Sequence, residues 1–195
     1  MSGEGHLLSR DVAAAVTYDA VVYDLDGTLV ELAVDWGAVA RDVASVLRER
    51  GVDIGSEGLW GMLELADETG HRDAVERTIT GYEETGAQES RRLALADGLP
   101  HTVPVGVCSL NAESACRVAL SVHDIDSAVG PVVGRTTVGS SKPDPEGLLW
   151  VVDELDADPA STLFVGDSQR DAETARRAGT DFAWASEFDQ RRYRA

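Results

Sequence analysis

The sequence predicts an α/β fold: a Rossmann-like parallel sheet with helices on both faces, plus a small all-helical cap inserted after the first strand. Short runs of apolar and β-branched residues alternate with helical patterns, which is typical of a parallel sheet whose strands are buried on both faces. The stretch from Val30 to about Gly98 breaks this alternation, because it contains helical patterns and no good strand. The expected parts are a discontinuous catalytic core at 18–30 and 99–195, a cap at 31–98 and an N-terminal arm at 1–17.

The first expected strand, residues 20–23, is an apolar run that closes on Asp24. Similar runs predict strands at 102–107, 132–133, 162–165 and 182–184. The helical patterns between them cover 111–120, 145–155 and 170–178. Asp144 is expected to cap the second of these helices, with Pro145 in its first position, and Gly179 is expected to end the third.

Four helices are expected in the insertion. The stripe of the first consists of Val39, Val43, Val46 and Leu47. That helix is expected to end at Gly51, and Ser56 is expected to cap the second. A third helix is expected over 72–82 and a fourth over 88–96.

Four further residues of the insertion are interpreted as structural or solvated. Trp36 and Trp60 either line the cleft between cap and core or pack within the cap, and packing is the favoured interpretation. Glu83 and Glu84 are expected to belong to a solvated surface, because pairs of acids are seldom buried.

Charge excludes some classes of partner. The 195 residues include 35 acidic and 17 basic side chains, a formal net charge of -18, which disfavours binding to nucleic acid and to anionic membrane surfaces. Residues 1–16 lack the pattern of a signal peptide, and no stretch reaches the roughly 18 apolar residues of a membrane span. Two cysteines, Cys108 and Cys116, make no disulfide framework. We expect a cytoplasmic protein, monomeric or homodimeric, that acts on a small molecule.

The segment after the first strand carries two acids. Asp24 and Asp26 are two residues apart, so both carboxylates point the same way at the end of a strand, and Gly27 allows a sharp turn. Thr28 offers a hydroxyl and an amide to an oxyanion. One carboxylate can stay ionised against a metal while the other holds a proton, which provides a nucleophile and an acid–base group.

A second acidic pair follows a later strand. Asp167 comes directly after the strand at 162–165, and Asp171 lies four residues further, one helical turn along the same face. Carboxylates from two strand ends supply the hard oxygen ligands that Mg²⁺ prefers. The alternative is that Asp167 merely caps the next helix.

Lys142 is the single lysine among 17 basic residues. A compact ammonium can face phosphate and carboxylate oxygens where a planar guanidinium does not fit. Ser109, at the end of another strand, could hold a phosphoryl oxygen at a helix N-terminus.

In this order, these segments resemble the four motifs of the haloacid dehalogenase-like hydrolases, closest to the phosphoglycolate phosphatase-like branch, over residues 18–184. The first motif is matched completely by 24–29, the second falls at Ser109, the third at Lys142 and the fourth at Asp167 and Asp171. The resemblance implies a Mg²⁺-dependent phosphatase that hydrolyses a small phosphorylated metabolite.

By this resemblance Asp24 attacks phosphorus and carries an aspartyl-phosphate, and Asp26 protonates the leaving alcohol and then deprotonates water. The implied metal ligands are Asp24, the backbone carbonyl of Asp26, Asp167 and Asp171. The expected substrate contacts are Thr28, Ser109, Asn111 and Lys142.

The chain departs from the family pattern in two places. Asn111 lies two residues after Ser109, whereas most relatives place asparagine directly after the hydroxyl residue. The segment 87–103 is also short for both the last cap helix and the helix that relatives carry before the second strand, so one of the two is reduced.

Other functions stay open. A phosphomutase or phosphotransferase of the same family is one alternative, and a non-enzymatic phospho-aspartate switch is another. A dehalogenase is disfavoured because Asp26 remains an acid, and a phosphonatase because the insertion contains no lysine.

The acidic, lysine-poor composition resembles that of proteins from salt-loving organisms. At low ionic strength the net charge of -18 repels itself over the whole surface. The midpoint of thermal unfolding should therefore rise by roughly 5 °C or more between a dilute buffer and molar KCl, measured by calorimetry. A midpoint that does not change with salt would contradict this prediction.

Overall fold

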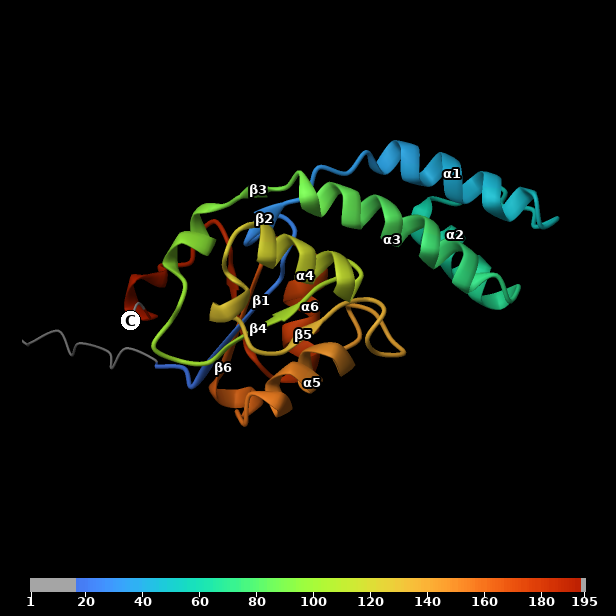
Figure 1. Cartoon of the computed structure of the whole chain (residues 1–195). Helices are drawn as coiled ribbons and strands as arrows, with labels where there is room; N and C mark the ends of the chain where they lie inside the picture. The colour runs from blue at the N-terminus through green and yellow to red at the C-terminus, as the bar shows by residue number, and fades with distance from the viewer. Residues whose placement is uncertain (1–16, 194–195) are drawn as a thin grey trace, which may run out of the picture.

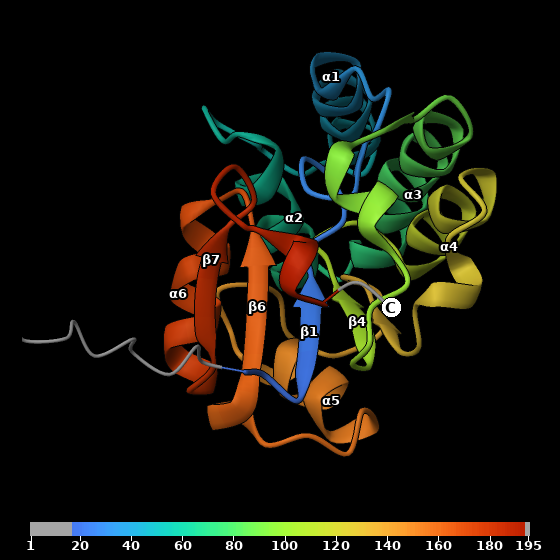
Figure 2. The same cartoon turned by 90° about the vertical axis from the view of Figure 1, so that its left-hand side faces the viewer.

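The computed structural model describes residues 17–193, so the predicted N-terminal arm lies outside the described residues apart from Thr17. Its centre is a five-stranded parallel sheet (Figures 1 and 2). In spatial order the strands are β5 (Val132–Val133), β4 (Val105–Cys108), β1 (Ala20–Tyr23), β6 (Thr162–Gly166) and β7 (Asp181–Trp184). The predicted parallel sheet and its five strands are confirmed.

Helices cover both faces of the sheet, as predicted. Helix α4 (Glu113–Val122) lies on one face, and α5 (Glu146–Glu154) and α6 (Gln169–Ala178) lie on the other (Figure 2). Strand β1 shows the reason, since Val21 and Tyr23 pack on the α4 side while Val22 packs among side chains of α5 and α6. Its burial on both faces explains the unbroken apolar run in its sequence.

Local signals at the ends of the core helices act largely as expected. Gly179 ends α6 with a φ of 77°, in the left-handed region that favours glycine. Helix α5 begins one residue later than predicted, so its N-cap residue is Pro145 and not Asp144, although the Asp144 carboxylate accepts a hydrogen bond from the backbone N–H of Glu146 at 2.9 Å. Both cysteines are buried and free.

The insertion between β1 and β4 consists of three α-helices that extend away from the sheet (Figure 1). They are α1 (Trp36–Arg48), α2 (Leu59–Glu68) and α3 (Arg72–Gln88). We call residues 36–88 the helical insertion. It has an apolar core of its own, to which α1 contributes Val39, Val43 and Leu47, as its stripe predicted.

Three predictions about the insertion are wrong. Gly58, and not Ser56, is the N-cap residue of α2. Helix α3 continues six residues past the predicted end at Tyr82. No fourth α-helix forms at 88–96, because the chain there forms the short strand β3 (Arg91–Arg92) and a 3-10 helix, Ala94–Gly98. The segment between α3 and β4 therefore contains no α-helix.

A pair of short antiparallel strands connects the helical insertion to the core. Strand β2 (Val30–Glu31) pairs antiparallel with β3, and the N–H of Leu93 donates to the carbonyl of Leu29 at 3.0 Å. Pairing the entering chain with the leaving chain fixes the position of α3, which packs against α4 of the core. The apolar side chains of the 3-10 helix that misled the helix prediction, Leu95 and Ala96, pack into the core.

Strands β1, β4 and β6 run parallel, so their carboxyl ends lie at one edge of the sheet, next to the helical insertion. Asp24, Ser109 and Asp167 follow these strands. Within residues 17–193, no helix combines the length and the apolar character needed to cross a membrane.

Gly86 is the point where α3 touches the chain entering the insertion. A Cβ built on Gly86 would lie 2.5 Å from Val34 Cγ2 and 3.0 Å from the backbone of Ala33, whose N–H donates to the Gly86 carbonyl at 3.1 Å. We expect Gly86→Ala to lower the free energy of unfolding by about 1–3 kcal/mol through this overlap, measured by urea denaturation. Gly81→Ala in the same helix is the matched control, because a Cβ built on Gly81 would meet no atom of another element within 4 Å. It should stabilise the protein by about 0.5–1 kcal/mol, and equal effects of the two variants would contradict this account.

Candidate active site

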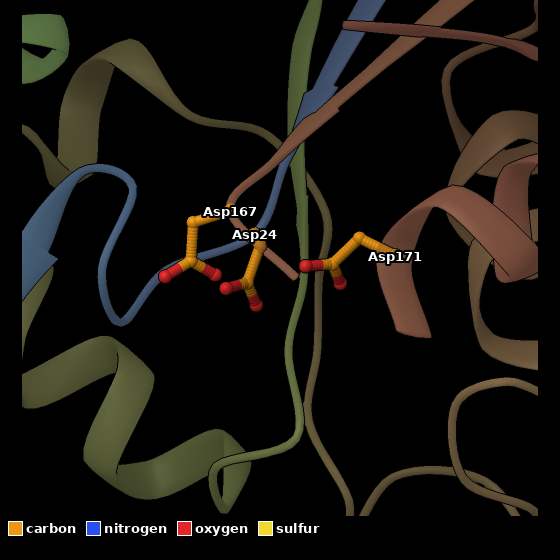
Figure 3. A group of neighbouring side chains, drawn as sticks. All are labelled: Asp24, Asp167 and Asp171. Atoms are coloured by element: carbon orange, nitrogen blue, oxygen red, sulfur yellow. The ribbon is translucent and has the colours of Figure 1, made fainter. Parts of the chain in front are cut away.

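Three carboxylates from two distant parts of the sequence meet at the edge of the sheet. Asp24 follows β1, Asp167 follows β6 and Asp171 reaches in from the first turn of α6, and their side chains point toward one another (Figure 3). One carboxylate oxygen from each lies within 4.8 Å of the other two. The convergence of Asp24 and Asp167 that the sequence predicted is therefore present, and so is the nearness of Asp171.

The ammonium of Lys142 lies among these carboxylates. It donates to Asp24 Oδ1 at 2.8 Å, to Asp171 Oδ1 at 2.5 Å and to the carbonyl of Cys108 at 3.3 Å. Burial alone would lower the pKa of Lys142, but the charges of Asp24 and Asp171 outweigh it and raise that pKa above its ordinary value. The single lysine of the chain is therefore a buried, charged group at the centre of the cluster.

Burial acts on the carboxylates in the opposite direction. It raises the pKa of Asp24 to about 6, although the charge of Lys142 lowers it. Burial also raises the pKa of Asp167, with a further contribution from the charge of Asp171. Carboxylates that are held ionised at such a cost favour a cationic partner in addition to Lys142.

Asp171 has two structural partners besides Lys142. Its Oδ2 accepts hydrogen bonds from the Ser168 hydroxyl at 2.6 Å and the Ser168 N–H at 3.0 Å, which forms a capping box at the start of α6. The residue that caps this helix is thus Ser168, and not Asp167 as the alternative interpretation required. Asp167 keeps a largely exposed side chain at the site.

A tight turn places Asp26 beside Asp24. Gly27 has a φ of 82°, and a Cβ at this position would overlap Asp167 Oδ2 at 2.1 Å, so only glycine fits. The Asp26 carboxylate is half-buried and accepts a hydrogen bond from the N–H of Leu32 at 2.8 Å. Burial raises the pKa of Asp26, and this hydrogen bond lowers it in part.

Ser109 and Asn111 line the same pocket as Asp24 and Asp167. The Ser109 hydroxyl donates to Asn111 Oδ1 at 3.0 Å and accepts from the N–H of Asn111 at 3.2 Å. Both side chains are buried. The displaced position of Asn111 in the sequence therefore still brings its side chain to the site.

Thr28 is the predicted contact that the structure does not bring to this pocket. Its N–H donates to the carbonyl of Leu25 at 3.2 Å, and its buried hydroxyl has no hydrogen-bond partner among the described residues. It borders a separate cavity, beside Gly27 and Trp184. A substrate contact of Thr28 stays a prediction.

The converging residues line a small pocket of about 150 Å³. Its members from the core are Asp24, Asp26, Ser109, Leu110, Asn111, Lys142, Asp167 and Ser168. Trp36 and Trp60 of the helical insertion complete the lining. The favoured interpretation of these tryptophans as internal packing is thus incomplete, because both also face the pocket. The guanidinium groups of Arg170 and Arg135 lie 5.6 and 6.0 Å from the Trp60 ring.

The prediction of a solvated Glu83 is wrong. Its side chain is fully buried and binds Arg135 through both oxygens, at 2.8 and 3.1 Å. One signal in the sequence pointed to this burial, because Glu83 lies four residues after Ile79 and eight after Val75 on the buried stripe of α3. Nothing in the sequence around Arg135 indicated its burial or its partner.

Comparisons with known proteins agree with the fold and identify the family. A family model described as haloacid dehalogenase-like hydrolase matches residues 93–185. A phosphoglycolate phosphatase of Rhodospirillum rubrum is 32% identical over 185 residues, covering 82% of this chain and 76% of the relative. An N-acetylmuramic acid 6-phosphate phosphatase of Pseudomonas aeruginosa is 30% identical over 183 residues, covering 84% and 80%.

A solved structure of a HAD-superfamily hydrolase of subfamily IA from Geobacter sulfurreducens superimposes with a TM-score of 0.57. The two sequences are 25% identical, and the match covers 85% of this chain and 88% of that one. The chain belongs to the haloacid dehalogenase-like hydrolases. The predicted family and the prediction that the chain is a hydrolase are confirmed.

Lys142→Met should expose the repulsion that the ammonium now offsets. We expect a loss of about 3–5 kcal/mol in unfolding free energy at pH 7.5, because Asp24 and Asp171 are left buried without their cation. Without Lys142 the folded-state pKa of Asp24 rises further above the ordinary value of 3.8, so the folded protein binds the proton more tightly than the unfolded chain. Stability should therefore return as the pH falls toward 5.

The measurement is urea denaturation at pH 7.5 and pH 5. Arg191→Met, which removes the exposed Arg191–Asp189 ion pair, is the control and should show no such dependence on pH. An equal loss for Lys142→Met at both pH values would contradict the electrostatic account.

Proposed function

We propose that this chain is a Mg²⁺-dependent phosphatase that hydrolyses a phosphomonoester of a small metabolite through an aspartyl-phosphate on Asp24. The observation that carries the proposal is the meeting of Asp24, Asp167 and Lys142 in one pocket, with Ser109 beside them. A nucleophile, an acid–base group, a cation and a hydroxyl donor are what phosphoryl transfer requires from a protein.

The donor set supports Mg²⁺ as the cofactor. Asp24 and Asp167 offer carboxylate oxygens close to each other, and Asp167 is exposed. Asp171 directs its oxygens to Ser168 and Lys142, so we assign it the support of the lysine and of the first turn of α6. When bound, the ion would neutralise charge on the phosphoryl oxygens.

The residues of the chain divide the chemistry among them. Asp24 is the nucleophile, and Lys142 holds one of its oxygens at 2.8 Å, which orients the carboxylate and keeps it ionised. Asp26, whose pKa is raised by burial, is suited to protonate the leaving alcohol and then to take a proton from the attacking water. Lys142 and Ser109 stabilise the transferring phosphoryl group through charge and hydrogen bonding.

A second cavity provides room for the organic part of a substrate. It has a volume of about 470 Å³, lies under α2 and shares Trp60, Leu110 and Lys142 with the small pocket. Arg72 and Arg170 also line it. We propose that the helical insertion acts as a cap whose tryptophans cover the reacting groups, and that this cavity receives the metabolite.

Two of the relatives support the class of substrate, since their names refer to phosphoglycolate and to a phosphorylated amino sugar acid. The alternative phosphomutase would return the phosphoryl group to a sugar phosphate, and a switch would keep a stable acyl phosphate without turnover. Release of inorganic phosphate therefore distinguishes a phosphatase from both alternatives.

The test is release of inorganic phosphate from an aryl phosphate in molar KCl with Mg²⁺. Asp24→Asn should lower the rate by about a thousandfold or more because the nucleophile is lost, while the protein stays folded because Asp171 still balances the charge of Lys142. EDTA should abolish turnover and added Mg²⁺ should restore it. Asp19→Asn, an exposed acid just before β1, is the control and should keep full activity. Retained turnover of Asp24→Asn, or full activity in EDTA, would falsify the nucleophile or the metal assignment.

A further inference from the structure

We propose that Glu83, on helix α3 of the helical insertion, is a positioning residue for the phosphate site: it fixes Asn111 and, through Asn111, the hydroxyl of Ser109. The inference rests on the proposed function, because it assumes that Ser109 holds the phosphoryl group. It gives the insertion a polar role at the site, in addition to the two tryptophans that line the pocket.

The hydrogen bonds of Glu83 form an unbroken chain to the pocket. Glu83 Oε1 accepts from Asn111 Nδ2 at 3.3 Å, and Glu83 Oε2 accepts from the N–H of Ala112 at 2.9 Å. Asn111 Oδ1 in turn accepts from the Ser109 hydroxyl at 3.0 Å. With its amide nitrogen bound to Glu83, Asn111 has one orientation in which its oxygen faces Ser109.

Arg135 offsets the energetic cost of burying the Glu83 carboxylate. A carboxylate without exposure to solvent needs a cation and a full set of donors, and Arg135 supplies two N–H groups to it. Arg135 also donates to the carbonyl of Leu110 at 2.6 Å and to Glu76 Oε2 at 3.0 Å. One guanidinium thus joins two carboxylates of α3 to the loop between Ser109 and Asn111.

The loops that carry Arg135 and Asn111 also pack closely through their backbones. The N–H of Arg135 donates to the carbonyl of Asn111 at 2.9 Å, and a Cβ on the preceding Gly134 would lie 2.5 Å from that carbonyl oxygen. The loop after β5 therefore lies directly against the loop after β4. Because α3 holds both through Glu83, the orientation of the phosphate-binding hydroxyl depends on the docked position of the insertion.

The alternative is that Glu83 acts only as a counter-charge to Arg135 or as packing. The two roles predict opposite effects on an anion. Glu83→Gln removes a negative charge near the pocket and leaves Arg135 with Glu76 as its carboxylate partner, so charge alone would strengthen phosphate binding. Loss of the orientation of Asn111 and Ser109 would weaken it.

The test is titration calorimetry of inorganic phosphate and, separately, of Mg²⁺ with the full chain. For Glu83→Gln we expect the dissociation constant of phosphate to rise about tenfold, which corresponds to about 1.4 kcal/mol, while that of Mg²⁺ stays within about twofold. Glu84→Gln, the next residue of α3, is the control and should change neither value. Unchanged or tighter phosphate binding by Glu83→Gln would overturn the inference.

A double-mutant cycle separates positioning from stability. Asn111→Ala should weaken phosphate binding, and adding Glu83→Gln to it should weaken binding no further, whereas the losses of unfolding free energy should continue to accumulate. Additive losses of phosphate affinity would also overturn the inference. If Glu83→Gln does not fold, Arg135→Lys takes its place in both experiments, because an ammonium lacks the planar fork that holds both oxygens of Glu83 in one orientation.

The proposed function and this inference fail in different ways. Wild-type protein that neither binds phosphate nor hydrolyses an aryl phosphate contradicts the proposed function. Wild-type protein that binds phosphate, with Glu83→Gln binding it equally well, contradicts the inference alone.

Discussion

The ammonium of Lys142, placed between Asp24 and Asp171, is the interaction on which the geometry of the site depends. Carboxylates this close repel each other, and burial makes the repulsion stronger, so they stay together as ions only around a cation. The three residues belong to the end of β1, the start of α6 and the loop before α5. The two ion pairs of Lys142 therefore connect the carboxyl end of β1 to the start of α6 and to the loop before α5.

The same physical solution is used twice around the pocket. Arg135 allows Glu83 to be buried on one side, as Lys142 allows Asp24 on the other. The types of cation differ with the task. The compact ammonium of Lys142 lies between two carboxylates as a point charge, whereas the planar guanidinium of Arg135 holds Glu83 through two parallel hydrogen bonds and also reaches Glu76. The first arrangement leaves room for a phosphoryl group, and the second fixes a helix against a loop.

Between them lies a pocket whose walls come from different parts of the chain. Strand ends of the core provide Asp24 and Ser109, while the helical insertion provides Trp60 and, one layer further out, Glu83. Asp24 thus lies at the end of a sheet strand, whereas Trp60 belongs to a unit with a separate apolar core. Movement of that unit would change access to the pocket and also the contacts of Asn111.

Patterns in consecutive residues were enough to predict the parallel sheet, the buried strand before Asp24, and the convergence of Asp24, Asp167 and Lys142, because strand burial and strand ends leave such patterns. The burial of Glu83, and the 3-10 helix that replaces an α-helix around Leu95, became evident only in the folded chain. The same is true of Thr28, which borders a cavity separate from the pocket. These outcomes depend on partners distant in sequence, such as Arg135 for Glu83, and a local pattern records which face of a helix is buried but not which charge it meets there.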